Sequence, residues 1–317
     1  MKKIIITGPG NSGSGAFIDL LKGQNDIYVP FHGQEFRLVN DPDGLQDLEN
    51  SLFNNFSHNN SANGFNKFEK FCNNLTNLKS KENKIYPKNF TNLYLQFLDK
   101  IKLLEYNGLP KFQFFNLTFS EKMKFYFDRL ILRKNIREID LFKMTIPTDH
   151  KTFLSESKNF IDNVIANSIK YDSKKIALLD QSLNIFNPES NLKFFSNTKC
   201  IITLRDPRAV FYMLKNSAQM AYDGLDILKF IKWYKFTYTK LKNINFDMSK
   251  FMVIQFEDFL NNYSNKRKEI FNFLEIKDDN NFFDIEWSKK NSEQTMTKLK
   301  KEHLDLIEKE LKDFLIW

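Results

Sequence analysis

Glycine is scarce in this sequence of 317 residues. The chain holds only 10 glycines, near half the usual share of about 7%. Four of them, Gly8, Gly10, Gly13 and Gly15, fall between residues 8 and 15. Because glycine reaches backbone conformations that other residues avoid, this concentration predicts a loop with a specific conformational demand.

Cysteine and long apolar runs are also lacking. Cys72 and Cys200 are the only cysteines, which excludes a disulfide framework and a cysteine-based zinc site and is typical of a reducing compartment. The amino-terminal run Ile4-Ile5-Ile6 breaks at Thr7-Gly8, before it reaches the length of a signal peptide. No stretch of about 18 apolar residues occurs, so we expect a cytoplasmic protein without a membrane span.

Charge of either sign is not concentrated. Lys and Arg number 47 against 39 Asp and Glu, a net charge of +8, which fits an anionic ligand but is too diffuse to indicate nucleic acid. A solvated lysine-rich surface explains it equally well. With 42% hydrophobic residues and 34 Phe the chain can bury a sizeable core. Its length favours one large α/β domain, residues 1–317, with an insertion.

Apolar runs and helical stripes alternate along the chain. Residues 3–7 predict a strand that leads into the glycine loop, and helical spacing resumes at Ala16. The pattern continues with strands at 175–180, 199–204 and 251–256 and helices at 153–171, 209–220 and 227–241. Asp206 can cap the 209–220 helix and Pro207 can open it. We therefore expect a three-layer fold, a parallel sheet with helices on both faces.

Residues 52–136 differ in composition, being rich in Asn, Lys and Phe. Phe65 and Phe68 lie on a helical stripe, as do Tyr94 and Phe97. This pattern predicts a helical insertion that packs through its Phe face. The Asn pairs at 54–55 and 59–60 are typical of loops.

The segment Gly8–Gly15 has the features of an anion-binding loop. Between a strand and a helix, backbone N–H groups and the positive end of the helix dipole face a bound anion. The spacing of Gly8 and Gly13 matches the start of a nucleotide P-loop, but Ser14 and Gly15 replace the expected lysine and hydroxyl residue. This disfavours an ATPase or GTPase. An unusual kinase stays open, as does a glycine turn without a ligand.

Together with Leu204-Arg205-Asp206-Pro207-Arg208-Ala209-Val210, the glycine loop resembles the sulfotransferases that use 3′-phosphoadenylyl sulfate. The segment 253–259 (VIQFEDF) looks like that family's strand before its late helix, and 287–291 (WSKKN) is similar to a donor-contacting segment of bacterial members. The order of these matches along nearly the whole chain carries the resemblance, which does not cover residues 52–136.

The resemblance implies a P-loop-like α/β fold with 3′-phosphoadenylyl sulfate as donor, adenosine 3′,5′-bisphosphate as product, no metal, and a carbohydrate or glycan acceptor. Residues 52–136 would form a lid on the acceptor side. The donor-binding residues it implies are Gly10, Asn11, Ser12, Gly13, Ser14 and Gly15 for the 5′-phosphosulfate and Arg205, Lys289 and Lys290 for the 3′-phosphate. Arg205 follows a buried strand, where a guanidinium can meet a phosphate with two parallel hydrogen bonds; pairing with Asp206 or Glu257 is its structural alternative.

Three side chains are candidates for the general base that deprotonates the acceptor, with Glu35 first, His32 second and Asp180 third. Glu35 follows the first helix at about the distance where glycan sulfotransferases place a catalytic glutamate, and a carboxylate paired with Arg37 is the alternative. His32 is suited to proton transfer near neutral pH. Asp180 ends a predicted parallel strand, at the edge where open α/β sheets bind ligands.

Three positions depart from the family pattern. Asn11 stands where a lysine or arginine is usual, Met213 where a serine is common, and Gln181 where some glycan sulfotransferases carry a lysine. These departures keep two other functions open. One is a kinase or other group transferase with a different nucleotide donor, and the other is a non-catalytic nucleotide-binding relative.

Overall fold

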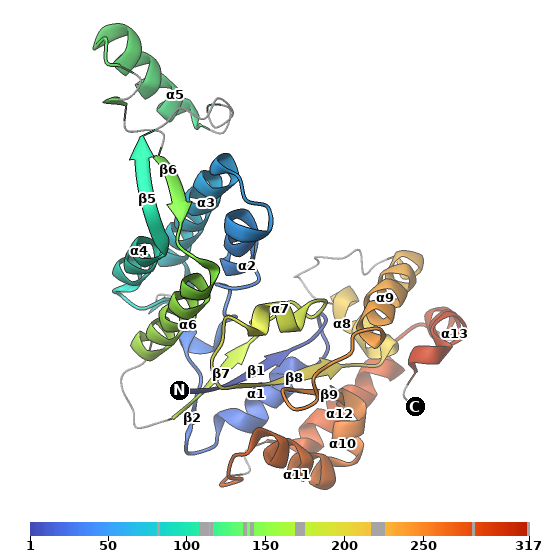
Figure 1. Cartoon of the computed structure of the whole chain (residues 1–317). Coiled ribbons are helices and arrows are strands. Elements are labelled where there is room, and N and C mark those ends of the chain that lie inside the picture. The colour runs from blue at the N-terminus through green and yellow to red at the C-terminus, as the bar shows by residue number, and fades with distance from the viewer. Residues whose placement is uncertain are drawn as a thin grey trace. The chain divides into compact units, whose positions relative to one another are not determined.

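The computed structural model divides the chain into two compact units. Residues 1–36 and 171–317 form the first unit, and residues 37–170 form the second, which contains the whole of the expected insertion at 52–136 (Figure 1). The structure describes residues 1–80, 83–107, 114, 117–135, 138–139, 143–168, 175–216, 226–280 and 283–315. No helix in these ranges is both long enough and apolar enough to cross a membrane.

A five-stranded parallel sheet lies at the centre of the first unit (Figure 1). Its order is β2-β7-β1-β8-β9, with all four pairings parallel. The strands are β1 (Lys2–Thr7), β2 (Ile27–Tyr28), β7 (Ile176–Asp180), β8 (Thr198–Leu204) and β9 (Phe251–Gln255). Continuous apolar runs form the inner strands, since Ile4, Ile5 and Ile6 of β1 are all fully buried. The predicted α/β class with a parallel sheet is confirmed.

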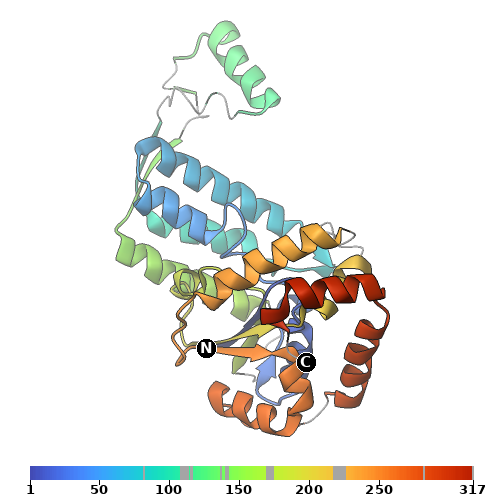
Figure 2. The same cartoon turned by 90° about the vertical axis from the view of Figure 1, so that its right-hand side faces the viewer.

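Helices lie on both sides of this sheet (Figure 2). They are α1 (Ser14–Lys22), α7 (Pro188–Leu192), α8 (Pro207–Asn216), α9 (Ile227–Lys242), α10 (Phe256–Asn261), α11 (Tyr263–Leu274), α12 (Ile285–Thr297) and α13 (Lys301–Glu310), with short 3-10 turns η1 (Phe31–Gly33) and η6 (Lys312–Phe314). Phe17 of α1, Phe259 of α10 and Phe271 of α11 share one core cluster with the strand residues Ile4 and Leu178. A second cluster joins α8, α9 and α13. The sheet is therefore covered on both faces, as expected.

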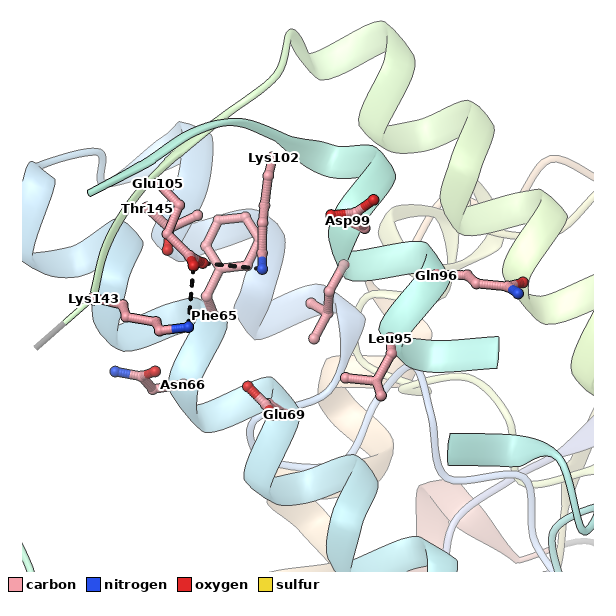
Figure 3. Close-up of a pocket in the computed structure, with 11 residues that line it drawn as sticks. Phe65, Asn66, Glu69, Leu95, Gln96, Asp99, Lys102, Glu105, Lys143 and Thr145 are labelled. Atoms are coloured by element: carbon pink, nitrogen blue, oxygen red, sulfur yellow. Dashed lines mark ion pairs between the residues drawn. The ribbon is translucent and has the colours of Figure 1, made fainter. Parts of the chain in front are cut away.

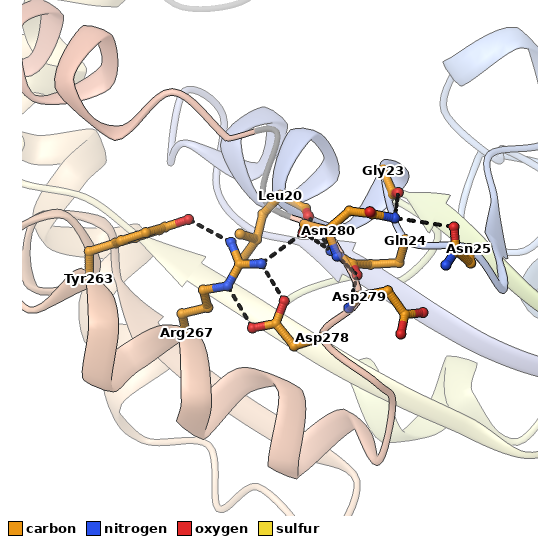
Figure 4. A network of polar contacts seen from close by, with 9 residues as sticks. All are labelled: Leu20, Gly23, Gln24, Asn25, Tyr263, Arg267, Asp278, Asp279 and Asn280. Carbon is orange, nitrogen blue, oxygen red and sulfur yellow. Dashed lines mark hydrogen bonds and ion pairs between the residues drawn. The ribbon is translucent and has the colours of Figure 1, made fainter.

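The carboxyl end of α1 is held by a polar network (Figure 4). Gln24 donates from Nε2 to the carbonyl of Asn280 at 2.7 Å and accepts from the amide of Asp279 at 2.9 Å. Arg267 of α11 donates to both carboxylate oxygens of Asp278 and, at 2.8 Å, to the same Asn280 carbonyl. These bonds tie the carboxyl end of α1 to α11 through the segment 278–280.

The second unit is a helical body with an antiparallel hairpin. Its elements are α2 (Leu45–Glu49), the π-helix η2 (Asn50–Asn54), α3 (His58–Thr76), the short pair β3 (Lys79–Ser80) and β4 (Asn83–Lys84), α4 (Phe90–Ile101), β5 (Lys102–Asn107), α5 (Phe119–Tyr126), the π-helix η4 (Phe127–Ile131), β6 (Lys143–Pro147) and α6 (His150–Asn167). Rings from three helices meet in its core: Phe97 of α4 stacks on Phe160 of α6 at 4.9 Å, and Phe68 of α3 lies 5.7 Å from Phe97. The expected packing through a Phe face is confirmed.

Several boundaries differ from those predicted. Asn59 and Asn60 are not in a loop but in the first turn of α3, because Ser57 caps this helix by accepting from the Asn60 amide at 3.0 Å. Asn54 likewise belongs to η2. The helix predicted over 209–220 begins earlier, at Pro207, and is described to Asn216; its expected last residues lie outside the described part.

Candidate functional site

The candidate residues of the first unit gather at one edge of the sheet. β1 lies between β7 and β8, and these strands end at Thr7, Asp180 and Leu204. Because parallel strands end at the same edge, the glycine loop, Asp180 and Arg205 all emerge there. This edge is where open α/β sheets bind ligands.

The glycine loop has the special backbone that its composition predicts. Asn11 (φ 61°) and Gly13 (φ 89°) are left-handed. A Cβ at Gly8 would lie 2.5 Å from the carbonyl oxygen of Thr203, and one at Gly13 would lie 2.8 Å from the Phe256 ring. At Gly15 a Cβ would meet no atom within 4 Å. Packing therefore requires Gly8 and Gly13, whereas Gly15 borders open space.

Two serines of the loop have different tasks. Ser12 is buried, and its hydroxyl lies 2.7 Å from that of Thr203 on β8, so it ties the loop to the sheet. Ser14 accepts from Nε2 of Gln181 at 3.2 Å and keeps its own hydroxyl hydrogen for another partner. The amides of Gly13, Ser14 and Gly15 donate no hydrogen bond within the described ranges, as expected at a helix amino terminus.

Arg205 is a buried cation with few partners. Its residue is 9% exposed, and the guanidinium lies 4.9 Å over the Phe256 ring. Nη1 reaches the carbonyl oxygen of Asn11 at 3.4 Å, and Nε is 3.8 Å from Oε1 of Glu257 but makes no hydrogen bond with the described chain. Burial lowers the pKa of the guanidinium, which nevertheless remains charged at neutral pH.

The neighbouring Arg208 is fully used by the fold. It donates from Nε and Nη2 to the two carboxylate oxygens of Asp206, at 3.0 and 2.8 Å, and from Nη1 to Glu308 of α13 at 3.0 Å. Asp206 also accepts from the Arg208 amide at 2.8 Å, which confirms it as the predicted cap of α8. The Asp206 carboxylate is therefore hydrogen-bonded to Arg208, while the Asp206 amide donates to Oε1 of Glu257 at 3.2 Å.

A cavity of about 460 Å³ opens beside Arg205, within the size range of small-molecule sites. Its lining residues are Gly13, Gly15, Ala16, Asp19, Arg205, Tyr212, Met213, Phe256, Phe283, Trp287, Ser288, Asn291, Ser292 and Lys298. Helix α12 turns Ser288 and Asn291 to this cavity, while half-buried Lys289 and exposed Lys290 do not line it. Lys298, just beyond α12, does line it and was missed, because the resemblance of the segment 287–291 to a donor-contacting segment pointed to Lys289 and Lys290.

Two carboxylates lie near the end of β7. Burial, and secondly the charge of Glu35, raises the pKa of Asp180 to about 6. Oδ1 of Asp180 is buried without a hydrogen-bond partner in the described chain. The Asp180 carbonyl accepts from the Phe36 amide at 3.1 Å, which holds the segment that carries Glu35 beside the sheet edge.

The segment before Glu35 is strained. Phe31, His32 and Gly33 all have positive φ, between 54° and 74°, and Gln181 after β7 has a φ of 49°. Such conformations in residues other than glycine cluster at functional sites. The His32 and Glu35 side chains are exposed, so both are open to solvent at this edge.

A second cavity, of about 480 Å³, belongs to the second unit. Figure 3 shows it between α3, α4 and the β5–β6 hairpin. Lys102 and Lys143 both pair with Glu105, at 3.0 and 3.3 Å. The other charged side chains that line this cavity are exposed. It holds no counterpart of the buried Arg205. Across the described ranges of both units, no group of three His, Cys, Asp or Glu residues could hold a metal ion.

No family model and no curated protein matches the chain. Solved structures similar to it are sulfotransferases. The enzyme from Alicyclobacillus acidocaldarius is 12% identical, with 99% of this chain and 92% of that chain covered and a TM-score of 0.39. The sulfotransferase domain of the Synechococcus PCC 7002 olefin synthase is 13% identical, with 88% and 74% covered and a TM-score of 0.40. A sulfotransferase from Mycobacterium tuberculosis H37Rv is 8% identical, with 98% and 76% covered and a TM-score of 0.39. Because these scores are low, the activity has to be inferred from the chain's own residues.

Proposed function

We propose that this chain is a sulfotransferase that moves a sulfuryl group from 3′-phosphoadenylyl sulfate to a hydroxyl or amine of a carbohydrate. The observation that carries the proposal is Arg205, a buried guanidinium whose Nε makes no hydrogen bond with the described residues and which lines one cavity together with Gly13 and Gly15. An underbonded cation and a helix amino terminus on one cavity suit a ligand with two separated anionic groups.

The donor fits the residues of this cavity. The amides of Gly13 and Gly15 would hold the 5′-phosphosulfate together with the hydroxyl of Ser14, which lies between them in the loop but is not among the lining residues, and Arg205 would hold the 3′-phosphate. Lys298 lines the same cavity and is better placed than Lys289 or Lys290 to add a charge. The rings of Phe256 and the exposed Trp287 offer faces on which an adenine can stack.

Asp180 is the best-suited general base. With a pKa of about 6 it is ionised at neutral pH yet basic enough to accept a proton. Its carboxylate would take the proton of the acceptor hydroxyl, whose oxygen bonds to sulfur while the bond between sulfur and the phosphate oxygen breaks. Glu35 beside it keeps that pKa high and is the second candidate, and the exposed His32 is the third. The acceptor class, and a role for residues 52–136 on the acceptor side, stay predictions.

The first experiment measures donor binding by calorimetry. We expect adenosine 3′,5′-bisphosphate to bind without added metal and Arg205→Ala to weaken it about 100-fold, the usual cost of losing one partner of a buried charged contact. Arg133→Ala, which removes an exposed arginine, is the matched control. Equal affinity of wild type and Arg205→Ala would contradict the donor site, and tight binding of ATP only with Mg²⁺ would favour a kinase.

The second experiment measures turnover against pH. We expect kcat/KM to rise about tenfold per pH unit up to about 6 and then level off, because protonated Asp180 cannot act as a base. Asp180→Asn should remove the activity, and with it the rise of kcat/KM below a pH of about 6. Glu35→Gln should move this rise to lower pH. Donor binding without turnover on any carbohydrate acceptor would instead support a non-catalytic nucleotide-binding protein.

A further inference from the structure

The segment between β5 and β6 carries an amphipathic helix whose apolar side faces outward. Residues Phe119, Met123, Tyr126, Phe127 and Leu130 of α5 and η4 recur at helical spacing and form one stripe. In a globular protein such a stripe packs on the core. Here Phe119 is 81% exposed and Leu130 72% exposed, and α5 has no buried residue.

One edge of the stripe contacts a neighbouring ring. Tyr126 and the adjacent Phe125 contact the Phe114 ring, with centroids 5.9 and 5.2 Å apart. A capping box starts the helix: the Thr118 hydroxyl accepts from the Glu121 amide, and the Glu121 carboxylate accepts from the Thr118 amide. The helix is therefore formed by local signals, and every residue of the stripe remains at least 47% exposed.

Basic residues flank the stripe. The segment 117–135 holds five basic residues and two acidic ones, a net charge of +3. Both acidic side chains are engaged locally, since Glu121 belongs to the capping box and Asp128 pairs with Lys134 at 3.2 Å. Lys124, Arg129 and Arg133 are exposed, so they present positive charge beside an apolar stripe.

We propose that the arm formed by residues 117–135 binds the surface of an anionic lipid bilayer. Its apolar stripe would enter the boundary between headgroups and acyl chains, and Lys124, Arg129 and Arg133 would meet the lipid phosphates. α5 and η4 together are about 20 Å long at about 1.5 Å per residue, too short to cross a hydrocarbon core of about 30 Å. Hence the arm lies on the membrane.

Charge complementarity favours a bilayer over a second copy of the chain. If two arms paired through their stripes, the lysine and arginine margins of both copies would be brought together and would repel each other. An anionic bilayer covers the same apolar residues and neutralises those margins. The proposal does not depend on the proposed sulfuryl transfer.

Vesicle flotation of the full chain tests this inference. We expect binding to vesicles of phosphatidylcholine mixed with phosphatidylglycerol, weaker binding at high salt, and little binding to phosphatidylcholine alone. Lys124→Gln with Arg133→Gln should weaken binding about 25-fold, since each cation near an anionic surface contributes about fivefold. Phe119→Gln with Leu130→Gln should lose at least as much.

The control is Leu228→Gln, which removes an exposed apolar side chain of α9 in the first unit and should leave binding unchanged. All these residues are exposed, so thermal unfolding of every variant should match wild type. Equal binding to neutral and anionic vesicles, or no binding to either, would overturn the proposal. So would concentration-dependent self-association that Leu130→Gln abolishes, because the stripe would then serve a second copy.

Discussion

Each end of α1 lies near a buried arginine, and the two arginines differ in how many hydrogen bonds they make. Arg267, near the carboxyl end, is 8% exposed, and Arg205, at the amino-terminal loop, is 9% exposed. Arg267 donates from all three guanidinium nitrogens to Tyr263, Asp278 and Asn280 (Figure 4). Within the described chain, the guanidinium of Arg205 makes one long hydrogen bond, to Asn11, and lies 3.8 Å from a carboxylate oxygen of Glu257.

The two arginines are equally buried but differ in hydrogen bonding. This difference distinguishes the amino-terminal end of α1, where we propose that the donor binds, from the carboxyl end, which supports the fold. Desolvating a cation is costly unless its donors are satisfied, so Arg267 is explained by the fold alone. Arg205 bears the same cost with most of its donors not bonded to any described residue, beside a cavity that could admit an anion. A structural arginine is thus identified by its partners, and a binding arginine by their absence within the described chain.

The largest expected effect is on the supporting end. Arg267→Ala leaves Asp278 and the Asn280 carbonyl without their partner and should lower the free energy of unfolding by about 3 kcal/mol. Urea unfolding measures this loss. Adenosine 3′,5′-bisphosphate affinity of the folded protein should stay at its wild-type value. A loss of affinity as large as that of Arg205→Ala would show that the two ends do not have separate roles.

The next effect concerns the carboxylates beside the two arginines. Burial raises the pKa of Glu257, next to Arg205, to about 7 from an ordinary 4.5. The folded state then holds a proton that the unfolded state has lost, so the free energy of unfolding should fall as pH rises from about 4.5 to 7. Glu257→Gln should remove this decline and stabilise the protein by up to about 3 kcal/mol above pH 7.

Asp278→Asn provides the contrast, because it weakens a bonded pair and should destabilise the protein at neutral pH. Urea unfolding across the pH range compares both variants with wild type. The glutamine oxygen can still accept from the Asp206 amide, as Oε1 of Glu257 does at 3.2 Å. If Glu257→Gln nevertheless lowers stability at high pH, the charge of Glu257 is a stabilising partner of Arg205, and the contrast between the two ends fails.

The order of strands and helices was predictable from the sequence, but the division of the chain into two units was not. Buried parallel strands are continuous apolar runs, so β1, β7, β8 and β9 could be placed within a residue or two. The Asn pairs misled, because asparagine favours loops only where no cap and no buried face override it. At α3 both are present, because Ser57 caps the helix and Phe65 belongs to its buried face. That residues 37–170 form a separate unit depends on which helices pack together, which spacing does not specify.

The candidate site was predictable to the level of a sheet edge. Parallel strands alone bring the glycine loop, Asp180 and Arg205 together. The separate tasks of Ser12 and Ser14 were not predictable, since they depend on the register that sets Thr203 of β8 beside the loop. Which face of α12 meets the cavity excludes Lys289 and Lys290 from its lining, and the turn after α12 brings Lys298 to it. Both are decided by tertiary packing.

The smallest expected effect tests the amino-terminal end of α1 directly. Gly15→Ala adds a methyl group that meets no atom within 4 Å, so it should stabilise the helix by about 0.5 to 1 kcal/mol. The same methyl group borders the cavity and should weaken adenosine 3′,5′-bisphosphate binding severalfold, because it hinders close approach to the backbone amides. Gly23→Ala is the matched control at the other end, where φ is −82° and ψ is −8°. This variant should stabilise the protein without changing its affinity for adenosine 3′,5′-bisphosphate. Equal affinities for both variants in calorimetry would place the anion away from the start of α1.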